Sequence, residues 1–320
     1  MIISKTPLRI SFLGGATDLP GFYRQYGGCV LTMAIDKHIY CMVSKRFDKK
    51  IGISGRVFDS VDQVDHEIAR EALKMTDING GVDVVFASDI PAEGSGLGSS
   101  STVSVGLLAA LRKYKDIPVV TDELAADACT LEIERLNKPI GVQDQYIAAY
   151  GGLRFVEFNK DGKITVDDVK VIPEVIRNLE DHMMVFYTGI TRKSETILTE
   201  QKANIPDKNQ VLQKMAQMAR DGVPVLESGD IEKFGVMLDE GWKLKKSLAS
   251  KISNNEIDEL YEAAKKAGAY GGKISGAGGG GFLTLLVPAR KKDKVREAAG
   301  SLVEMPVKLS AAGSTILLDS

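Results

Sequence analysis

Short apolar runs, rich in β-branched residues and bounded by glycine, proline or aspartate, recur along the chain and predict strands. Strands are predicted over residues 2–12, 29–35, 39–47, 82–87, 153–158, 183–187 and 282–287, with two short ones near Val307 and Ile316. The polar pair Asp36–Lys37 predicts a turn between the second strand and the third.

Apolar residues spaced by three or four positions predict helices between and after these strands. Helices are predicted over residues 61–75, 103–111, 121–137, 142–150, 193–220, 231–250, 255–267 and 290–302. Thr121 suits the N-cap of the third of them. The mixed order of strands and helices predicts an α+β (mixed α/β) protein with two lobes. The seam between the lobes is expected within residues 160–185.

Composition narrows the function classes. The chain has 320 residues, with 41 Lys+Arg against 43 Asp+Glu, and this balance argues against a nucleic-acid-binding protein. No apolar run approaches the roughly 20 residues that cross a bilayer, and the N-terminus lacks a signal-peptide pattern. Three scattered cysteines and three scattered histidines argue against disulfides and structural zinc. We therefore expect a cytoplasmic protein with no membrane partner.

The most specific pattern is the loop over residues 91–101, in which three spaced glycines are followed by three consecutive serines. Gly94, Gly96 and Gly98 let the backbone adopt positive φ, which turns successive N–H groups toward one point. The serines begin a predicted helix, whose N-terminus attracts anions. The loop lacks the lysine of a Walker A motif, and Ser99 replaces the last glycine of a Rossmann fingerprint. It is interpreted as another kind of phosphate loop; a helix cap after a flexible turn is the alternative.

A second glycine-rich loop, residues 273–281, precedes a predicted strand. It matches the dinucleotide pattern formally, but a strand follows where that motif has a helix. Ordering glycine costs about 0.5–1 kcal/mol per residue relative to alanine in regular structure, so a loop with so many glycines is more often functional. We expect its backbone to approach the substrate or the transferred phosphate at Gly276, Gly278 and Gly279. A tight hairpin packed against another strand is the alternative.

The N-terminal strand places Arg9 on the face opposite its apolar neighbours, pointing across the sheet or into a cleft. Gly14–Gly15 breaks the strand and leaves Thr17 and Asp18 on a loop, where a carboxylate could hold a polyol. Taken alone, Arg9 is better interpreted as a solvated strand residue, and Asp18 as part of an Asx turn.

Together these three segments resemble the GHMP kinase superfamily, which includes galactokinases, homoserine kinases, mevalonate kinases and phosphomevalonate kinases. The resemblance covers essentially the whole chain. It implies a two-lobed fold, with one lobe similar to ribosomal-protein and elongation-factor domains and the other ferredoxin-like. It also implies an N-terminal ATP-binding domain over residues 1–180, a C-terminal domain over residues 181–320, and the use of ATP and Mg²⁺.

Residues 7–20 and 139–146 more closely resemble the D-glycero-D-manno-heptose 7-phosphate kinases. Galactokinases typically carry Glu-His where this chain has Gly15-Ala16, a departure that suggests a roomier or differently charged sugar pocket. L-fucose kinases share the Gly-Gly style of the first motif and stay an alternative.

The resemblance implies that Asp144 accepts or orients the proton of the reacting hydroxyl, with Arg9 beside it. It implies that Ser100 and Glu132 bind Mg²⁺; Glu134, two residues away, has the poorer spacing. Nucleotide phosphates are expected to bind Gly94, Ser95, Gly96, Leu97, Gly98, Ser99 and Ser100. The sugar is expected to bind Gly15, Thr17, Asp18, Arg192, Gly276, Gly278 and Gly279.

Arg192 is the expected anchor for a phosphate on the acceptor, because guanidinium binds phosphate in a bidentate manner; a solvated basic helix start is the alternative. The implied reaction is ATP-dependent phosphorylation of the anomeric hydroxyl of the heptose 7-phosphate to the 1,7-bisphosphate, for nucleotide-activated heptose synthesis. The chain is expected to be a monomer or homodimer. The alternatives are an anomeric kinase for an unphosphorylated L-fucose- or galactose-type sugar, and a non-catalytic sugar or nucleotide sensor.

Overall fold

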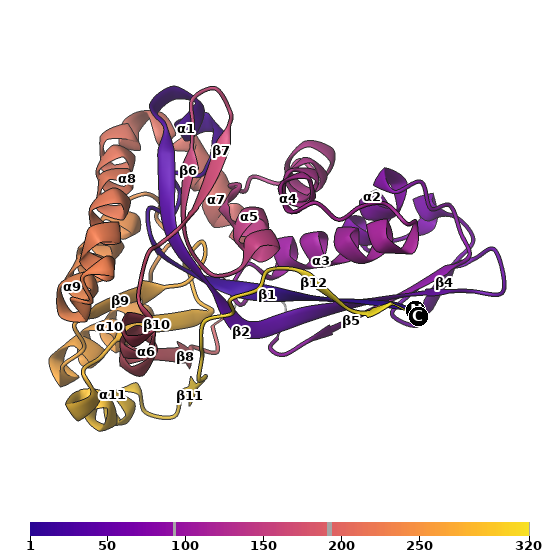
Figure 1. Cartoon of the computed structure of the whole chain (residues 1–320). Helices are drawn as coiled ribbons and strands as arrows, with labels where there is room; N and C mark the ends of the chain where they lie inside the picture. The colour runs from indigo at the N-terminus through magenta and orange to yellow at the C-terminus, as the bar shows by residue number, and fades with distance from the viewer. Residues whose placement is uncertain (92–93, 191–193, 320) are drawn as a thin grey trace.

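The computed structural model describes residues 1–91, 94–190 and 194–319, which form two sheets covered by helices (Figure 1). The larger sheet follows the order β12-β1-β2-β5-β3-β4, and β6 and β7 extend it from β2. Its strands are β1 (Ile2–Leu13), β2 (Gly28–Lys45), β3 (Ile51–Ile53), β4 (Arg56–Phe58), β5 (Val82–Ser88), β6 (Leu153–Phe158), β7 (Ile164–Asp168) and β12 (Thr315–Asp319). The smaller sheet has the order β11-β8-β10-β9, formed by β8 (Met183–Tyr187), β9 (Gly271–Ile274), β10 (Phe282–Leu286) and β11 (Val303–Glu304).

Helices α2 to α5 lie along one face of the larger sheet, α8 packs against β1, β2 and α9, and α9 to α11 lie with the smaller sheet (Figure 1). In chain order, the helices that come before β8 are α1 (Pro20–Tyr26), α2 (Glu67–Met75), α3 (Ser99–Tyr114), α4 (Thr121–Cys129), α5 (Gln143–Tyr150) and α6 (Pro173–His182). Those that come after β8 are α7 (Ser194–Ala203), α8 (Ile205–Glu227), α9 (Ile231–Lys246), α10 (Asn255–Ala267) and α11 (Lys292–Ala299). A π-helical segment, Thr130–Arg135, continues α4, and 3₁₀ turns lie at Val61–Gln63 and Ala289–Lys291.

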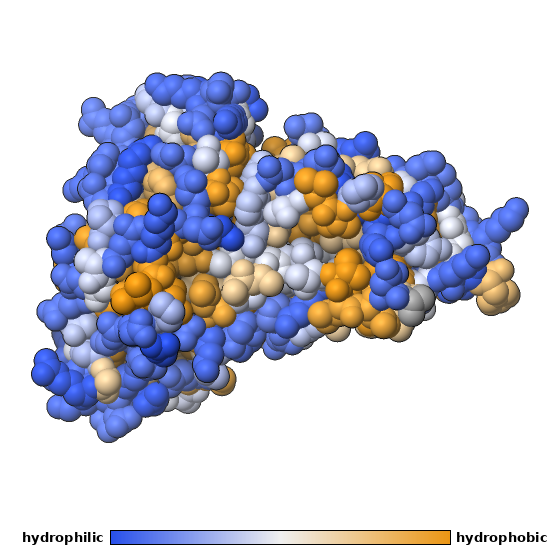
Figure 2. Space-filling model, in the orientation of Figure 1, coloured by the Kyte–Doolittle hydropathy of each residue, from blue (hydrophilic) through white to orange (hydrophobic). Residues whose placement is uncertain are grey.

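Helix α3 is the central helix of the first lobe. Its side chains from Val105 to Leu111 are almost all buried, and the helix packs against β1 and β2. At its start, the Thr102 hydroxyl donates to the carbonyl oxygen of Pro7 at 3.2 Å; further along, the Ser4 hydroxyl donates to that of Gly106 at 2.7 Å. The N-terminus of α3 is therefore fixed beside the second half of β1. On the face drawn in Figure 2, hydrophilic residues cover most of the surface.

The predicted turn at Asp36–Lys37 is wrong, because β2 runs through it. Pro7 pairs with His38 and Leu8 with Ile35, so the two intervening residues form a bulge opposite β1. The Asp36 N–H donates to the Lys308 carbonyl oxygen at 2.9 Å, and the Asp36 carboxylate accepts from the Lys308 N–H at 2.9 Å. A segment more than 270 residues away in sequence therefore holds this bulge, and no local pattern could show it.

Other boundaries also shift. The helix predicted over 61–75 begins at Glu67, because His66 Nδ1 accepts from the Ala69 N–H at 3.2 Å as an N-cap. Thr121 is the first residue of α4 rather than its N-cap, which is Val120. The strand expected near Val307 lies at Val303–Glu304. The patterns had not indicated β3, β4, β7, β9, α1 or α6.

The α+β fold class is confirmed. The chain leaves the larger sheet after β7 and enters the smaller one at β8, within the expected seam. Its last strand, β12, returns to pair antiparallel with β1, Ile2 facing Asp319. The domain boundary at residue 180 stays a prediction, as do the cytoplasmic location and the oligomeric state. Within the described parts of the chain, none of the helices has both the length and the apolar character to span a bilayer.

Candidate active site

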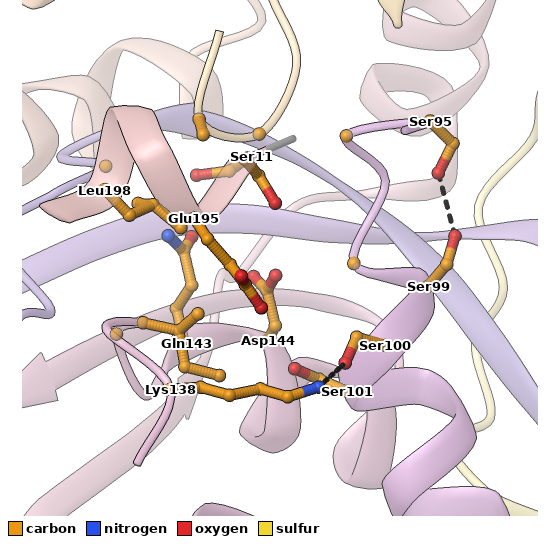
Figure 3. A pocket seen from close by; sticks show the side chains of 18 of the residues that line it. Ser11, Ser95, Ser99, Ser100, Ser101, Lys138, Gln143, Asp144, Glu195 and Leu198 are labelled. Atoms are coloured by element: carbon orange, nitrogen blue, oxygen red, sulfur yellow. Dashed lines mark hydrogen bonds between the residues drawn. The ribbon is translucent and has the colours of Figure 1, made fainter. Parts of the chain in front are cut away.

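A cavity of about 920 Å³ lies where several loops meet the N-termini of α3 and α5. Its walls come from β1, the loop before α1, residues 94–101, the start of α5, helix α7 and the glycine-rich loop before β10. Ser100, Lys138, Asp144 and Glu195 point into it from four different segments (Figure 3). Segments more than 250 residues apart, such as those carrying Arg9 and Gly276, therefore face one volume.

The loop before α3 has the backbone geometry that its sequence predicts. Gly94, Gly96 and Gly98 all have positive φ, at 68°, 71° and 83°. Gly98 is the N-cap of α3, and the Ser95 and Ser99 hydroxyls lie 2.8 Å apart, linking the loop to the first turn. The helix N-terminus therefore faces the cavity with N–H groups that lack helical partners, an arrangement that suits phosphate.

The two glycine-rich loops are in contact. A Cβ built on Gly96 would lie 2.5 Å from the Ser275 carbonyl oxygen, and one on Gly276 would lie 2.6 Å from the Gly96 Cα. A Cβ on Gly281 would lie 2.4 Å from the Ser95 carbonyl oxygen. The glycines therefore allow backbone to pack on backbone, and the second loop closes over the first.

Replacement of Gly96 by alanine is expected to destabilise the protein more than replacement of Gly55. Both glycines have positive φ, but nothing lies within 4 Å of a Cβ on Gly55. The conformational cost of alanine, about 1–2 kcal/mol, is common to both variants, and the Gly96 variant adds the clash with Ser275. Denaturant unfolding measures the difference; equal unfolding free energies for the two variants would contradict the packing described.

Arg9 and Asp144 form a bidentate ion pair. Arg9 Nε donates to Asp144 Oδ1 at 2.7 Å, and Nη2 donates to Oδ2 at 2.6 Å. Arg9 Nη1 also donates to the Gly96 carbonyl oxygen at 2.5 Å, and the Arg9 side chain is only 5% exposed. Asp144 is more open, at 22%. The guanidinium therefore links the catalytic candidate to the phosphate loop and fixes the orientation of both.

Ser100 and Glu132 meet at the other side of the α3 N-terminus. The Ser100 hydroxyl donates to Glu132 Oε1 at 2.5 Å, and Gln145 Nε2 donates to Oε2 at 2.7 Å. Glu132 is fully buried, and burial raises the pKa of its carboxyl, although its hydrogen bonds with Ser100 and Gln145 lower it. Lys138 Nζ lies 3.3 Å from Ser100 Oγ, as Figure 3 shows, and pairs with Glu67 at 2.8 Å.

This donor set fits Mg²⁺, which prefers hard oxygen ligands and takes few of them from protein when phosphates supply the rest. A serine hydroxyl and a carboxylate stand together beside the expected phosphate site. Among the described residues there is no cluster of three or more His, Cys, Asp or Glu side chains that could hold a metal on its own. A cation here would therefore depend on oxygens from a bound nucleotide.

Asp18 is buried beside Asp144. Its carboxylate accepts from the Ala16 N–H at 3.1 Å and from the Gln143 N–H at 3.3 Å. Burial raises the pKa of Asp18, and the negative charge of Asp144 raises it further. A Cβ on Gly141 would lie 1.9 Å from Asp18 Oδ2, so the glycine leaves space for this carboxyl. Asp18 and Asp144 therefore form one acidic wall of the cavity.

Among the described residues, four predicted site residues do not line the cavity: Thr17, Leu97, Gly279 and Glu132. The Thr17 hydroxyl donates to the Cys29 carbonyl oxygen at 2.9 Å and accepts from the Cys29 N–H at 3.1 Å. These two hydrogen bonds hold the loop in place, so the hydroxyl is not directed toward a sugar. Leu97 is buried, and its carbonyl oxygen accepts from the Arg9 N–H at 3.0 Å. Gly279 donates to the Ile252 carbonyl oxygen at 2.8 Å. Arg192 lies outside the described residues. The Glu132 carboxylate lies behind Ser100. The other predicted site residues that the structure describes all line the cavity.

Sequence reasoning missed several polar residues of the cavity. Lys245 on α9 is 4% exposed and donates to the Gly276 carbonyl oxygen; burial, then the nearby Arg9, lowers its pKa to about 8. Ser11 Oγ and Gln143 Oε1 are buried, line the cavity and have no hydrogen-bond partner within the described parts of the chain. A lysine within a predicted helix is normally expected to be exposed to solvent. The residues around Lys245 in the sequence therefore gave no indication that its side chain enters the cavity.

Two family models match the chain. The model described as GHMP kinases N terminal domain matches residues 64–152, and the model described as GHMP kinases C terminal matches residues 223–304. Ser100, Glu132 and Asp144 lie within the first match, and Lys245 and Gly276 lie within the second.

Individual relatives agree with these matches. A D-glycero-alpha-D-manno-heptose 7-phosphate kinase from Campylobacter jejuni is 32% identical over 315 residues, which cover 91% of this chain and 91% of that protein. A crystal structure described as a D-glycero-D-manno-heptose 1-phosphate kinase from Bacteriodes thetaiotaomicron has a TM-score of 0.81 at 26% identity and covers 100% of both chains. The galactokinase from Lactococcus lactis, solved with galactose, has a TM-score of 0.80 at 21% identity, covers 98% of this chain and 94% of that one, and shares the fold.

Proposed function

The chain belongs to the GHMP kinase family and is a sugar kinase with ATP as a substrate; we propose that it phosphorylates the anomeric hydroxyl of D-glycero-D-manno-heptose 7-phosphate, giving the 1,7-bisphosphate. The observation that carries the proposal is the Arg9–Asp144 ion pair, hydrogen-bonded to the phosphate loop at one end of the cavity. The 32% identical relative is named for this substrate.

The loop over residues 94–101 would bind the triphosphate through its N–H groups, with its end group directed toward Asp144. Gly98 supports this placement, because a Cβ there would lie 3.3 Å from Asp144 Oδ2 and 3.3 Å from Arg9 Cγ. The phosphate loop and the carboxylate are therefore adjacent, as in-line transfer to a hydroxyl between them requires.

Asp144 would accept a hydrogen bond from the anomeric hydroxyl and receive its proton as the oxygen attacks the terminal phosphorus. Arg9 keeps the carboxylate oriented and adds positive charge beside the transferred group. Asp18, across the acidic wall, would hold other hydroxyls of the sugar. Ser100 and Glu132 would hold Mg²⁺, which neutralises phosphate charge when bound.

An ADP-release assay over a set of acceptors tests the proposed substrate. Heptose 7-phosphate is expected to support much faster turnover than mannose 6-phosphate, L-fucose or galactose. Heptose 1-phosphate should fail as a substrate, because its anomeric oxygen is already esterified. Turnover with only an unphosphorylated sugar, or with heptose 1-phosphate in preference, would contradict the proposed substrate and leave the kinase assignment in place.

A further inference from the structure

Two buried lysines of the second lobe lie at or beside the cavity: Lys245 lines it, and Lys273 lines a small pocket that adjoins it. Lys245 and Lys273 are each 4% exposed. Lys245 Nζ donates to the Gly276 carbonyl oxygen, and Lys273 Nζ donates to the carbonyl oxygens of Ser11 at 2.7 Å and Phe12 at 3.2 Å. Among the salt bridges of residues 1–91, 94–190 and 194–319, neither lysine has a carboxylate partner.

The direction of β1 shows how the cavity runs from the N-terminus of α3 toward Ser11 and the loop that carries Gly15. Pro7 contacts Thr102 in the first turn of α3, and the Arg9 N–H contacts the Leu97 carbonyl oxygen in the phosphate loop. Ser11 is the next residue on the same face of the strand, about 7 Å further along. The cavity therefore extends from the α3 N-terminus, past Arg9 and Asp144, to Ser11 and the loop that carries Gly15.

At this far end the side chains leave space and an unused hydrogen-bonding group. Ser11 Oγ is buried, lines the cavity and has no partner among the described residues. A Cβ built on Gly15 would lie 3.7 Å from Ser11 Oγ and 3.9 Å from Lys273 Nζ, and, apart from the two chain neighbours of Gly15, no other described residue has an atom within 4 Å of it. Lys245 borders the same loop: it lines both the main cavity and a small adjoining pocket that also contains Gly15 and Lys273.

The two lysines lack a close counter-charge. Arg9 is paired with Asp144, whereas the buried Asp18 acts on both lysines, and Asp144 on Lys245, only from beyond ion-pair distance. Burying ammonium groups without counter-charge is costly, and burial does lower the pKa of Lys245 and Lys273, an effect that an adjacent anion would oppose. A dianionic group bound against Ser11 and Lys245 would supply the missing charge.

We propose that Ser11, Gly15 and Lys245, with Lys273 behind them, form the subsite for the phosphate already present on the sugar acceptor. This proposal rests on the proposed function and goes further, because it names what in the cavity distinguishes a sugar phosphate from a free sugar. The nucleotide binds at the α3 end, the reacting hydroxyl meets Asp144, and the phosphate at the far end of the acceptor binds the lysine end. Gly15 matters because it leaves the path to Ser11 and the lysines open.

The test compares Lys245→Met with Lys243→Met. Both remove a lysine charge from α9, but Lys243 is 65% exposed and pairs with the largely buried Asp239, outside the cavity. Lys245→Met is expected to raise the KM for the sugar phosphate roughly 10- to 100-fold, the loss typical of a charge-assisted phosphate contact, with the KM for ATP within about twofold of wild type. Lys243→Met should change neither value. An equal rise in both KM values would place Lys245 on the nucleotide, and no change in either would exclude it from phosphate binding; each result overturns the proposal.

A second pair of variants does not depend on the folding of Lys245→Met. Gly15→Glu and Gly15→Gln add side chains of equal size into the same space, where no positive φ opposes them. The glutamate places a negative charge beside Ser11 and Lys273, so it should weaken binding of the sugar phosphate at least about tenfold more than the glutamine does. Equal losses for the two variants would show that only volume matters there and would overturn the proposal.

Equilibrium binding separates this proposal from the proposed substrate. Calorimetric titration with mannose 6-phosphate and with inorganic phosphate needs no turnover. Wild-type binding that Lys245→Met weakens at least about tenfold supports the subsite even if heptose 7-phosphate proves to be no substrate. Binding of both probes that is unaffected by Lys245→Met would refute the subsite, even if the enzyme phosphorylates the heptose phosphate.

Discussion

Replacement of Asp144 by asparagine is expected to lower kcat about 10²- to 10⁴-fold, the contribution typical of a positioned proton acceptor. The amide retains the size of the side chain but cannot take the hydroxyl proton. Nucleotide affinity should stay within a few fold of wild type, because the loop over residues 94–101 is expected to bind the nucleotide through its backbone N–H groups. The measurement is steady-state ADP release combined with calorimetric titration of nucleotide.

Asp167→Asn is the matched control, since Asp167 is exposed on β7 of the same lobe. Some loss of stability is expected for Asp144→Asn, because Arg9 is almost fully buried and loses its counter-charge. Thermal unfolding at the assay temperature therefore accompanies the kinetics. Retained turnover in a folded Asp144→Asn variant would remove Asp144 from its catalytic role.

Replacement of Glu132 by glutamine is expected to lower the apparent affinity for Mg²⁺ by at least roughly 10- to 100-fold. Removal of a residue that only hydrogen-bonds a metal ligand typically causes a loss of this size, and loss of a ligand itself should cost no less. Glutamine occupies the same buried space and can still accept from the Ser100 hydroxyl. It supplies no negative charge, however, so the apparent Mg²⁺ concentration for half-maximal activity should rise. Activity measured across a Mg²⁺ titration shows the effect.

Glu134→Gln is the control for this change, since Glu134 is exposed two residues away. It should leave the Mg²⁺ dependence as in wild type, in keeping with the better spacing of Glu132. A loss in Glu132→Gln that is the same at every Mg²⁺ concentration would assign Glu132 a structural role beneath Ser100 instead of a metal-binding one.

The backbone geometry of the loop over residues 94–101 was predictable because it depends only on neighbouring residues in the sequence. Three glycines at alternate positions favour positive φ, and the serines after them favour the start of a helix. The structure has both features. The order of strands and helices was predictable for the same reason, since each depends on apolar periodicity within about ten residues. Resemblance to the family supplied what spacing could not, namely that Glu132 and Ser100 belong together.

The features that sequence analysis missed depend on distant contacts. Lys308 holds the bulge at Asp36–Lys37, and nothing near residue 36 indicates it. Lys245 has charged neighbours in sequence and looks solvated, but its helix packs against the smaller sheet and turns it into the cavity. Thr17 occupies the expected loop, yet its hydroxyl is engaged by Cys29 across that loop. Each case needed a partner that only the folded chain supplies.

A crystal structure with Mg²⁺ and a non-hydrolysable ATP analogue tests the central claim most directly. The account predicts the triphosphate against the N–H groups of residues 94–100, the metal at Ser100 and Glu132, and the terminal phosphorus facing Asp144. A triphosphate bound at the lysine end of the cavity, or away from the α3 N-terminus altogether, would contradict it.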